Sequence, residues 1–263
     1  MSKINTLFQD KKQNILSVYF TAGFPNLNDT TTIINELEKS GVDLIEIGMP
    51  FSDPLADGPT IQRSSEIALE NGMTIKLLFE QLKIVNSTIP LVLMGYLNPI
   101  LQYGVEKFCK DASALRISGV IIPDLPFQEY LDEYKTIFEK YNLKNIFLIT
   151  PQTSEARIRL IDEYTDGFIY MVSSASTTGA KNEIGSEQEQ YFKRIKEMNL
   201  KNPTVIGFGI HNQQTFSKAC EFANGAIIGS AFIKAIETGE DLEKDIGVFV
   251  NTILKEQLAH RNS

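Results

Sequence analysis

Residues 46–62 read EIGMPFSDPLADGPTIQ, and this stretch decides the interpretation of the chain. It continues the apolar run that begins at residue 43, places the carboxylate Glu46 in the middle of that run, and enters a Pro-rich loop carrying Asp53 and Asp57. A strand covered by helices on both faces normally reads as continuous apolar sequence. A carboxyl group there costs several kcal/mol if it is ionised and unpaired, so it is normally paired, protonated or part of a functional site. Glu46 is therefore a poor core residue, and we expect it to have a functional role.

Short apolar runs rich in β-branched residues recur along the whole chain, at residues 15–23, 42–50, 90–99, 119–126, 145–151, 167–173, 203–210 and 225–232. Amphipathic stretches of helical length, such as residues 30–41 and 128–141, separate most of them. Strands that alternate with helices predict right-handed crossovers and a parallel sheet. Eight such units in about 250 residues are typical of a closed (β/α)8 TIM barrel, and a doubly wound open sheet is the structural alternative.

The chain shows no sign of division into several domains. It has 263 residues, 43% of them hydrophobic, with no Pro/Gly/Ser-rich linker, so we expect residues 1–263 to form a single (β/α)8 barrel catalytic domain. The first residues are expected to form an extra N-terminal helix on the barrel floor. The closing helix is expected within residues 240–258.

Charge and composition indicate which kinds of binding partner and which cellular compartment suit the chain. A net charge of -8 leaves no basic face for nucleic acid. The two cysteines form neither a metal-binding spacing nor a framework of bridges, which suits a reducing compartment. The N-terminal residues lack the apolar run of a signal peptide or membrane span and the composition of a transit peptide. These features predict a cytoplasmic protein with no membrane contact.

Glu46 and Asp57 form a candidate acid/base pair. Glu46 shares one face of its strand with Leu44 and Gly48, and in a barrel interior its pKa should rise towards neutrality. Asp57 lies in a polar loop and is expected to stay ionised. Two carboxylates whose environments separate their pKa values can divide acid and base roles. Glycosidase chemistry is the alternative, but the chain has no Trp for a sugar platform and does carry a candidate phosphate site.

The candidate phosphate site rests on glycine-bearing loops late in the chain. Gly209 follows the seventh expected strand, and Gly229 and Ser230 follow the eighth, where barrels often bind phosphate with backbone N–H groups. Gly179, in the loop after the sixth strand, could close over the site. There is no Walker or GxGxxG sequence, so a nucleotide is not implied. No His/Cys/Asp cluster suggests a metal site.

From TAGFP at residues 21–25 to IIGSAF at residues 227–232, the chain resembles the tryptophan synthase alpha subunit family, and residues 46–62 match its signature nearly letter for letter. The resemblance implies retro-aldol cleavage of indole-3-glycerol phosphate to indole and glyceraldehyde 3-phosphate, with no cofactor in this chain. Glu46 falls on the family's catalytic glutamate and would shuttle protons. Asp57 falls on its catalytic aspartate and would accept a hydrogen bond from the indole N–H.

The resemblance also assigns other site residues. The substrate-binding positions are Tyr19, Met94 and Leu148 in the indole pocket, the active-site Tyr170, the loop residue Thr178, and the phosphate positions Gly179, Gly209, Gly229 and Ser230. Asp53, Asn98 and Pro126 fall where the family docks its beta subunit, which holds pyridoxal phosphate in an alpha2-beta2 heterotetramer. The loop after the sixth strand departs from the family pattern, because Ser174 replaces a usual Arg and Ser176 a usual Gly.

Three functions follow from this resemblance. The first is a catalytic alpha subunit that passes indole to a beta subunit for tryptophan synthesis. The second is a stand-alone indole-releasing lyase with the same chemistry, against which Asp53 and Asn98 on the expected docking surface argue. The third is a non-catalytic activating subunit, against which the presence of both Glu46 and Asp57 argues. Other phosphate-binding barrels should not need the motif at residues 46–62.

Overall fold

The computed structural model describes residues 2–173, 185–207, 209–238 and 240–261. Within these residues, nine parallel strands form one sheet in the order β5-β4-β3-β2-β1-β9-β8-β7-β6. The strands are β1 Ile15–Thr21, β2 Leu44–Gly48, β3 Leu91–Met94, β4 Gly119–Ile121, β5 Lys144–Ile146, β6 Leu148–Ile149, β7 Ile169–Val172, β8 Thr204–Gly207 and β9 Gly225–Ile228.

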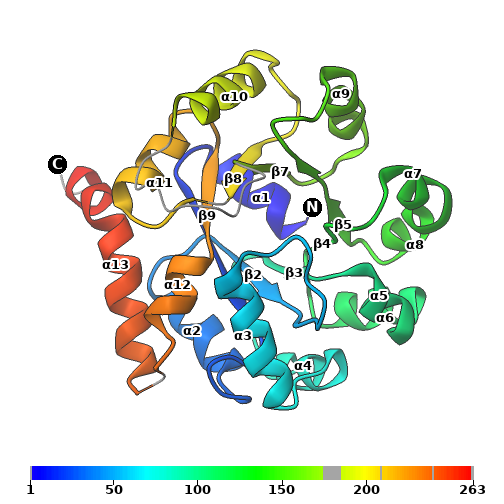
Figure 1. Ribbon diagram of the computed structural model, residues 1–263, viewed down its shortest axis with the longest axis vertical. Coiled ribbons are helices and arrows are strands. Elements are labelled where there is room, and N and C mark those ends of the chain that lie inside the picture. The colour runs from blue at the N-terminus through cyan, green and yellow to red at the C-terminus, as the bar shows by residue number, and fades with distance from the viewer. Residues whose placement is uncertain (1, 174–184, 208, 239, 262–263) are drawn as a thin grey trace.

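The two strands at the ends of this order, β5 and β6, are halves of one strand interrupted at Phe147. The Phe147 carbonyl accepts a hydrogen bond from the Tyr170 N–H at 2.9 Å, so the sheet closes on itself through the chain. The result is a closed parallel barrel, which confirms the predicted fold class over the open-sheet alternative. Figure 1 shows the strands at the centre with the helices in a ring around them.

Helices follow the strands around the outside of the barrel. They are α1 Lys3–Asp10, α2 Thr30–Lys39, α3 Pro59–Glu70, α4 Ile75–Leu82, α5 Leu97–Tyr103, α6 Val105–Ala114, α7 Phe127–Glu129, η1 Tyr130–Tyr134, α8 Lys135–Lys140, α9 Glu155–Tyr164, α10 Ser186–Glu197, α11 Gln213–Cys220, α12 Ser230–Ala235 and α13 Leu242–Arg261. The closing helix α13 packs beside α2 (Figure 1). No described helix is long and apolar enough to cross a membrane.

Helix α1 covers the end of the barrel at which the strands begin. Its Ile4 side chain is fully buried and reaches Gly119 at the start of β4 and Gly167 just before β7. Ser2 caps the helix by accepting a hydrogen bond from the Asn5 N–H at 3.3 Å. The expected N-terminal helix on the barrel floor is therefore confirmed, and the opposite end of the barrel is left for a binding site.

The expected helix at residues 128–141 is helical but not regular. It is divided into α7, the π-helical η1 and α8. Tyr130, at the start of η1, is buried, and its ring packs edge-on against Phe138 and Phe147, with centroids 5.6 and 5.2 Å away. A π-turn adds one residue to a helical turn. The extra residue lets both Tyr130 and Phe138 face the core.

Candidate active site

Glu46 lies inside the barrel, fully buried, in the middle of β2 and level with Tyr19 on β1 and Val92 on β3. The Ser17 hydroxyl donates a hydrogen bond to Glu46 Oε1 at 2.9 Å. Among the described residues, the buried Oε2 has no hydrogen-bond partner. Burial raises the pKa of Glu46 to about 8, and the Ser17 hydrogen bond opposes that rise. At neutral pH the side chain is therefore mainly a neutral acid that can donate a proton.

Asp57 lies in the loop between β2 and α3. The Tyr96 hydroxyl donates to its Oδ2 at 3.1 Å and accepts a hydrogen bond from the Ala56 N–H at 2.9 Å. Burial raises the pKa of Asp57 to about 6, against the opposing effect of the Tyr96 hydrogen bond. Asp57 is half-buried in this loop. It is still mainly ionised at neutral pH.

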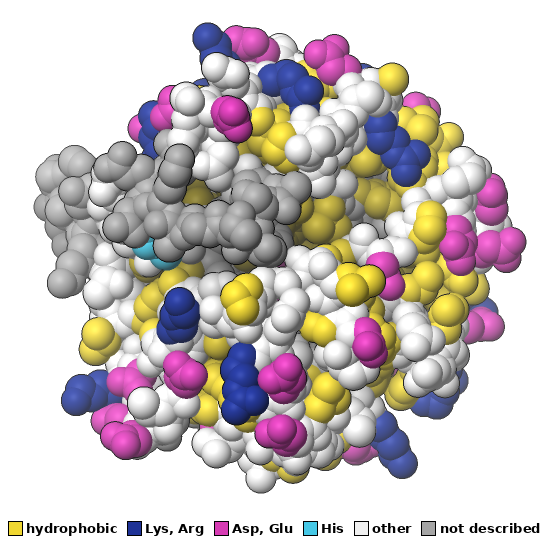
Figure 2. All heavy atoms as spheres, in the orientation of Figure 1, with side chains coloured by type: hydrophobic (Ala, Val, Ile, Leu, Met, Phe, Trp, Pro, Cys, Tyr) yellow, Lys and Arg dark blue, Asp and Glu magenta, His cyan; other side chains and the backbone are white. Residues whose placement is uncertain are grey.

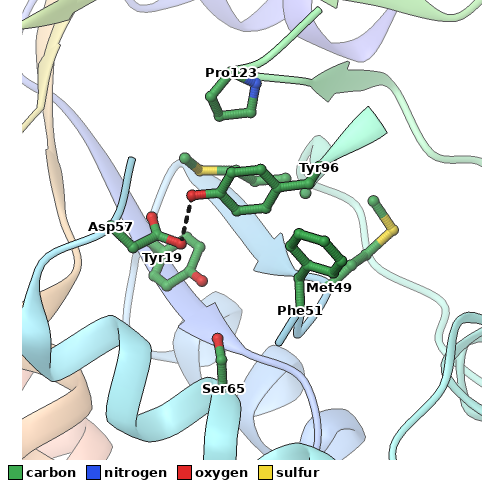
Figure 3. Close-up of a pocket in the computed structure, with 9 residues that line it drawn as sticks. Tyr19, Met49, Phe51, Asp57, Ser65, Tyr96 and Pro123 are labelled. Atoms are coloured by element: carbon green, nitrogen blue, oxygen red, sulfur yellow. Dashed lines mark hydrogen bonds between the residues drawn. The ribbon is translucent and has the colours of Figure 1, made fainter. Parts of the chain in front are cut away.

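A pocket opens beside Asp57 at the end of the barrel where the strands finish. It is a narrow hollow lined by Tyr19, Met49, Phe51, Asp57, Ser65, Met94, Gly95, Tyr96 and Pro123. Figure 3 shows Asp57 and Tyr96 facing each other across it, with the Phe51 ring beside Tyr96. Those two ring centroids lie 5.2 Å apart. Apolar walls with one carboxylate suit an aromatic ligand that carries a hydrogen-bond donor.

Two tyrosines predicted for the substrate site project into the barrel interior from β1 and β7. The Tyr19 ring lies over Gly48 on β2, and the Tyr170 ring lies over Gly207 on β8, where in each case a side chain would overlap the phenol. The charges of Glu46 and Asp57 both help to raise the Tyr170 pKa, although burial is the main cause. The two tyrosines and the two carboxylates thus share one interior space.

Leu148 and Met94, the other predicted pocket residues, lie on the same interior. Leu148 is half-buried on β6, level with Tyr170 on β7, and Met94 ends β3 and lines the pocket. All four apolar or aromatic positions implied by the resemblance therefore face the barrel interior at its open end or line the pocket there.

The late glycine loops follow β8 and β9, and α12, which follows β9, packs against α3, which begins just after Asp57. Gly209 follows β8 with φ +77°, a conformation that favours glycine. Gly229 caps α12 and contacts the Tyr19 ring, since a Cβ built on it would lie 3.4 Å from Tyr19 Cδ1. Ser230 is exposed at the first turn of α12. Thr178 and Gly179, the remaining predicted contacts, lie outside the described residues.

The three residues predicted for partner docking lie after successive strands on one rim of the barrel, with Asn98 in the first turn of α5. Asp53 follows β2, Asn98 follows β3 and Pro126 follows β4, and all three are exposed. Between Asp53 and Asp57, Leu55 exposes 96% of its surface. Figure 2 views the molecule from the same side as Figure 1 and shows yellow apolar side chains scattered over this face and lining a hollow near its centre.

Sequence reasoning missed two residues that contact the carboxylates. Tyr96 lies in the YLNP segment, which ends a strand in the way the other site loops do, and this position was the available signal. Ser17 is a small polar residue on the interior face of a barrel strand, and that mismatch was the signal for it. Among the described residues, no group of three or more His, Cys, Asp or Glu side chains could hold a metal ion.

Comparison with known proteins agrees with this geometry. The family model described as tryptophan synthase alpha chain matches residues 5–259. A tryptophan synthase alpha chain from Flavobacterium psychrophilum is 62% identical over 255 residues, covering 96% of this chain and 100% of the relative. The alpha chain from Flavobacterium johnsoniae is 63% identical over 236 residues, covering 89% of this chain and 93% of the relative.

Solved structures give the same result. The crystal structure of tryptophan synthase subunit alpha from Legionella pneumophila has a TM-score of 0.86 at 32% identity, with 97% of this chain and 98% of that chain covered. A Mycobacterium tuberculosis tryptophan synthase structure has a TM-score of 0.87 at 28% identity, with 97% of each chain covered. Sequence and structure together show that the chain belongs to the tryptophan synthase alpha chain family.

Proposed function

We propose that Glu46 and Asp57 carry out the reaction of this family, the cleavage of indole-3-glycerol phosphate, which is a lyase reaction. The observation that carries the proposal is the pair of carboxylates in the barrel, the fully buried Glu46 and the half-buried Asp57, with pKa values of about 8 and about 6. Near neutral pH one is a proton donor and the other is an anion. That division of roles is what the cleavage requires.

Glu46 acts as the proton shuttle. Its neutral carboxyl group donates a proton to C3 of the indole, which turns that carbon into a leaving group. The resulting carboxylate then takes the proton from the hydroxyl on the adjacent side-chain carbon, whose C–O bond becomes the aldehyde of glyceraldehyde 3-phosphate as the C–C bond breaks. The electrons of the broken bond return to the indole ring, and Glu46 ends the cycle protonated.

Asp57 acts through its charge. Positive charge develops on the indole nitrogen when C3 is protonated, and an ionised carboxylate that accepts the N–H hydrogen bond stabilises it. Tyr96 fixes Asp57 Oδ2 by donating to it at 3.1 Å, which leaves Oδ1 for the substrate. Tyr19 and Met94, with Phe51, supply apolar walls for the ring.

The phosphate group is proposed to bind at the loops after β8 and β9. Gly209 and Gly229 keep side chains away from the backbone there, and the first turn of α12, at Ser230, offers N–H groups to an anion. We also propose that Thr178 and Gly179 contribute to this side of the site, as the family resemblance implies. Residues 1–263 are proposed to act as a single catalytic domain.

The family assigns the chain a beta-subunit partner, which holds the pyridoxal phosphate of the joint enzyme, whereas the alpha reaction needs no cofactor. We propose that the assembly is an alpha2-beta2 heterotetramer, docked through Asp53, Asn98 and Pro126, and that indole passes within it to the beta subunit. A cytoplasmic location is also proposed, because both cysteines are free thiols and the substrate is a phosphorylated metabolite.

Substitution of the two carboxylates tests the proposed roles. Glu46→Gln should lower kcat for indole release by about 10²–10⁴-fold, because the amide keeps the shape but cannot shuttle a proton. Asp57→Asn should also lower kcat, because charge stabilisation is lost in the transition state. Glu70→Gln, an exposed change on α3, is the control. A Glu46→Gln rate above about a tenth of wild type would remove Glu46 from this role, and an Asp57→Asn effect confined to KM would remove Asp57.

The two other functions remain distinguishable by one assay, which measures indole release with and without a beta subunit. Stimulation of an already measurable rate is expected for a catalytic alpha subunit. An unchanged rate would indicate a stand-alone lyase, against which the exposed Leu55 on the docking rim argues. No indole release under either condition would indicate an activating subunit, against which the Glu46–Asp57 geometry argues.

A further inference from the structure

Ser17 is an unusual residue for its place in the barrel. It lies on β1 with 1% of its surface exposed, level with Leu44 on β2 and Ile227 on β9. Interior layers of such barrels are filled mainly by bulky branched side chains. A hydroxyl in this layer costs free energy unless it finds a hydrogen-bond partner. Its partner is Glu46 Oε1, at 2.9 Å.

The position of Ser17 follows from the strand register. Side chains two apart on a strand share a face, so Ser17 and Tyr19 both point into the barrel from β1. Glu46 is level with Tyr19, one interior layer nearer the barrel mouth than the Ser17–Leu44 pair. Ser17 therefore meets the carboxyl group from the barrel floor side. Ser17 does not line the pocket, so it can act on the substrate only through Glu46.

We propose that Ser17 is a positioning residue for Glu46: its hydroxyl holds Oε1 and thereby makes Oε2 the oxygen that exchanges protons with the substrate. A neutral carboxylic acid has one carbonyl oxygen, which accepts, and one hydroxyl oxygen, which donates. Because Ser17 donates to Oε1, Oε1 is the carbonyl oxygen and the acidic proton is on Oε2. Oε2 is also the atom without a hydrogen-bond partner among the described residues. This inference rests on the proposed shuttle role of Glu46.

The same hydrogen bond also affects proton affinity. Burial raises the pKa of Glu46 to about 8, and Ser17 is the group that opposes the rise. The other titratable groups near Glu46 are Tyr19 on β1, Tyr170 on β7 and Asp57 in the loop after β2, while β3 contributes Val92 at the level of Glu46. Loss of the Ser17 hydroxyl should therefore raise the pKa of Glu46 further, which makes it a weaker acid and slows its donation of a proton to C3 of the indole.

Three substitutions at Ser17 test the proposal, with indole release measured across pH 5–10. Ser17→Ala should lower kcat about tenfold, as expected for losing one hydrogen bond to an ionising group. KM should stay within about twofold, because Ser17 is not in the pocket. The alkaline limb of the kcat profile should move to higher pH. Ser17→Thr keeps the hydroxyl, so its alkaline limb should lie at the wild-type pH. Ser17→Cys has a weak donor of similar size, so its alkaline limb should lie between those of the wild type and Ser17→Ala.

Ser118→Ala is the matched control, since Ser118 is also buried but precedes β4, away from Glu46. Melting temperatures check that each variant is folded, and if Ser17→Ala does not fold, the Thr–Cys comparison carries the test. An unshifted alkaline limb, or equal behaviour of the Ala and Thr variants, would overturn the proposal. A faster Ser17→Ala enzyme would also overturn it. If Glu46→Gln were itself active, the shuttle role would fail; if only the Ser17 variants behaved like wild type, the positioning role alone would fail.

Discussion

At the scale of single residues, the two carboxylates predict a bell-shaped pH dependence of kcat/KM. Asp57 must be ionised, so activity should fall on the acid side as the pH drops through about 6. Glu46 must enter the reaction protonated, so activity should fall on the alkaline side as the pH rises through about 8. Each limb then belongs to one residue, because kcat/KM reports ionisations of the free enzyme.

Tyr96→Phe should shift the acid limb alone. The Tyr96 hydrogen bond favours the ionised form of Asp57 and lowers its pKa, so without the hydroxyl the pKa should rise and the acid limb should move to higher pH. The alkaline limb should stay in place. Tyr103→Phe is the control, since the Tyr103 hydroxyl donates to an unrelated aspartate, Asp111, at 2.8 Å. An acid limb that stays at the same pH would mean that Asp57 does not set it.

Glu46→Gln should also be more stable than the wild type, and increasingly so as the pH rises. The folded pKa of about 8 lies above the ordinary 4.5, so between these values the unfolded chain gives up a proton that the folded chain keeps. Below pH 4.5 the Glu46 side chain does not lower the free energy of unfolding of the wild type. As the pH rises from 4.5 to about 8, the free energy of unfolding falls by about 1.4 kcal/mol per pH unit. Urea unfolding at pH 5 and pH 8 measures the gap in free energy of unfolding between Glu46→Gln and the wild type, with Glu70→Gln as the exposed control. A gap that does not widen would contradict a raised pKa.

The sequence identified Glu46 and Asp57 as candidate site residues because Glu46 interrupts an apolar strand, where a charge is costly, and Asp57 lies in the unusual Pro-rich loop that follows it. It did not predict their immediate partners. Ser17 is twenty-nine positions from Glu46 in sequence, and Tyr96 is thirty-nine from Asp57, so these contacts depend on strand register and loop path. The local sequence pattern contains information about neither the strand register nor the loop path. The partial burial of Asp57 was missed for the same reason, since its cover comes from another loop.

At the scale of elements, apolar runs predicted every strand of the barrel, and the alternation with helices predicted its closure. The division of the fifth strand at Phe147 and the π-turn η1 could not be predicted, and both lie beside the same group of aromatic rings. Tyr130, Phe138 and Phe147 form one aromatic cluster. Hydrophobic periodicity assumes a regular helix or strand, so it predicts neither a π-turn nor the change of pairing partner within one strand.

Helix α12 and its preceding loop give a prediction about phosphate binding. Gly229→Asp should weaken glycerol phosphate binding at least tenfold, because a carboxylate at the first turn repels the anion and occupies its N–H donors. Gly247→Asp, in α13 with open space around it, makes the same change in net charge and should bind normally. Calorimetric titration of both variants measures this. Equal affinity in the two would place the phosphate elsewhere.

At the scale of the whole molecule, α1 closes one end of the barrel, and the other end carries both the candidate site and the rim with Asp53, Asn98 and Pro126 that we propose for docking. The Asp124 carboxylate accepts a hydrogen bond from the Leu97 N–H at 2.9 Å, which ties the loops after β3 and β4 together. The loop that holds Asp57 also holds the exposed Asp53 and Leu55. A partner that covers this rim would therefore contact the same loop that positions a catalytic carboxylate, which offers a direct physical route for stimulation.

Leu55 provides the test of that route. Its side chain is 96% exposed, and covering it on association should contribute about 1.5–3 kcal/mol. Leu55→Ser should therefore weaken binding of a beta subunit by roughly 10–100-fold, as measured by calorimetric titration. Stimulation of indole release should then require a correspondingly higher beta-subunit concentration. Val248→Ser, which alters another exposed aliphatic side chain, on α13, should bind like wild type. If the two variants bound equally well, the beta subunit would have to dock away from the rim that carries Asp53, and its influence on Asp57 would need another path.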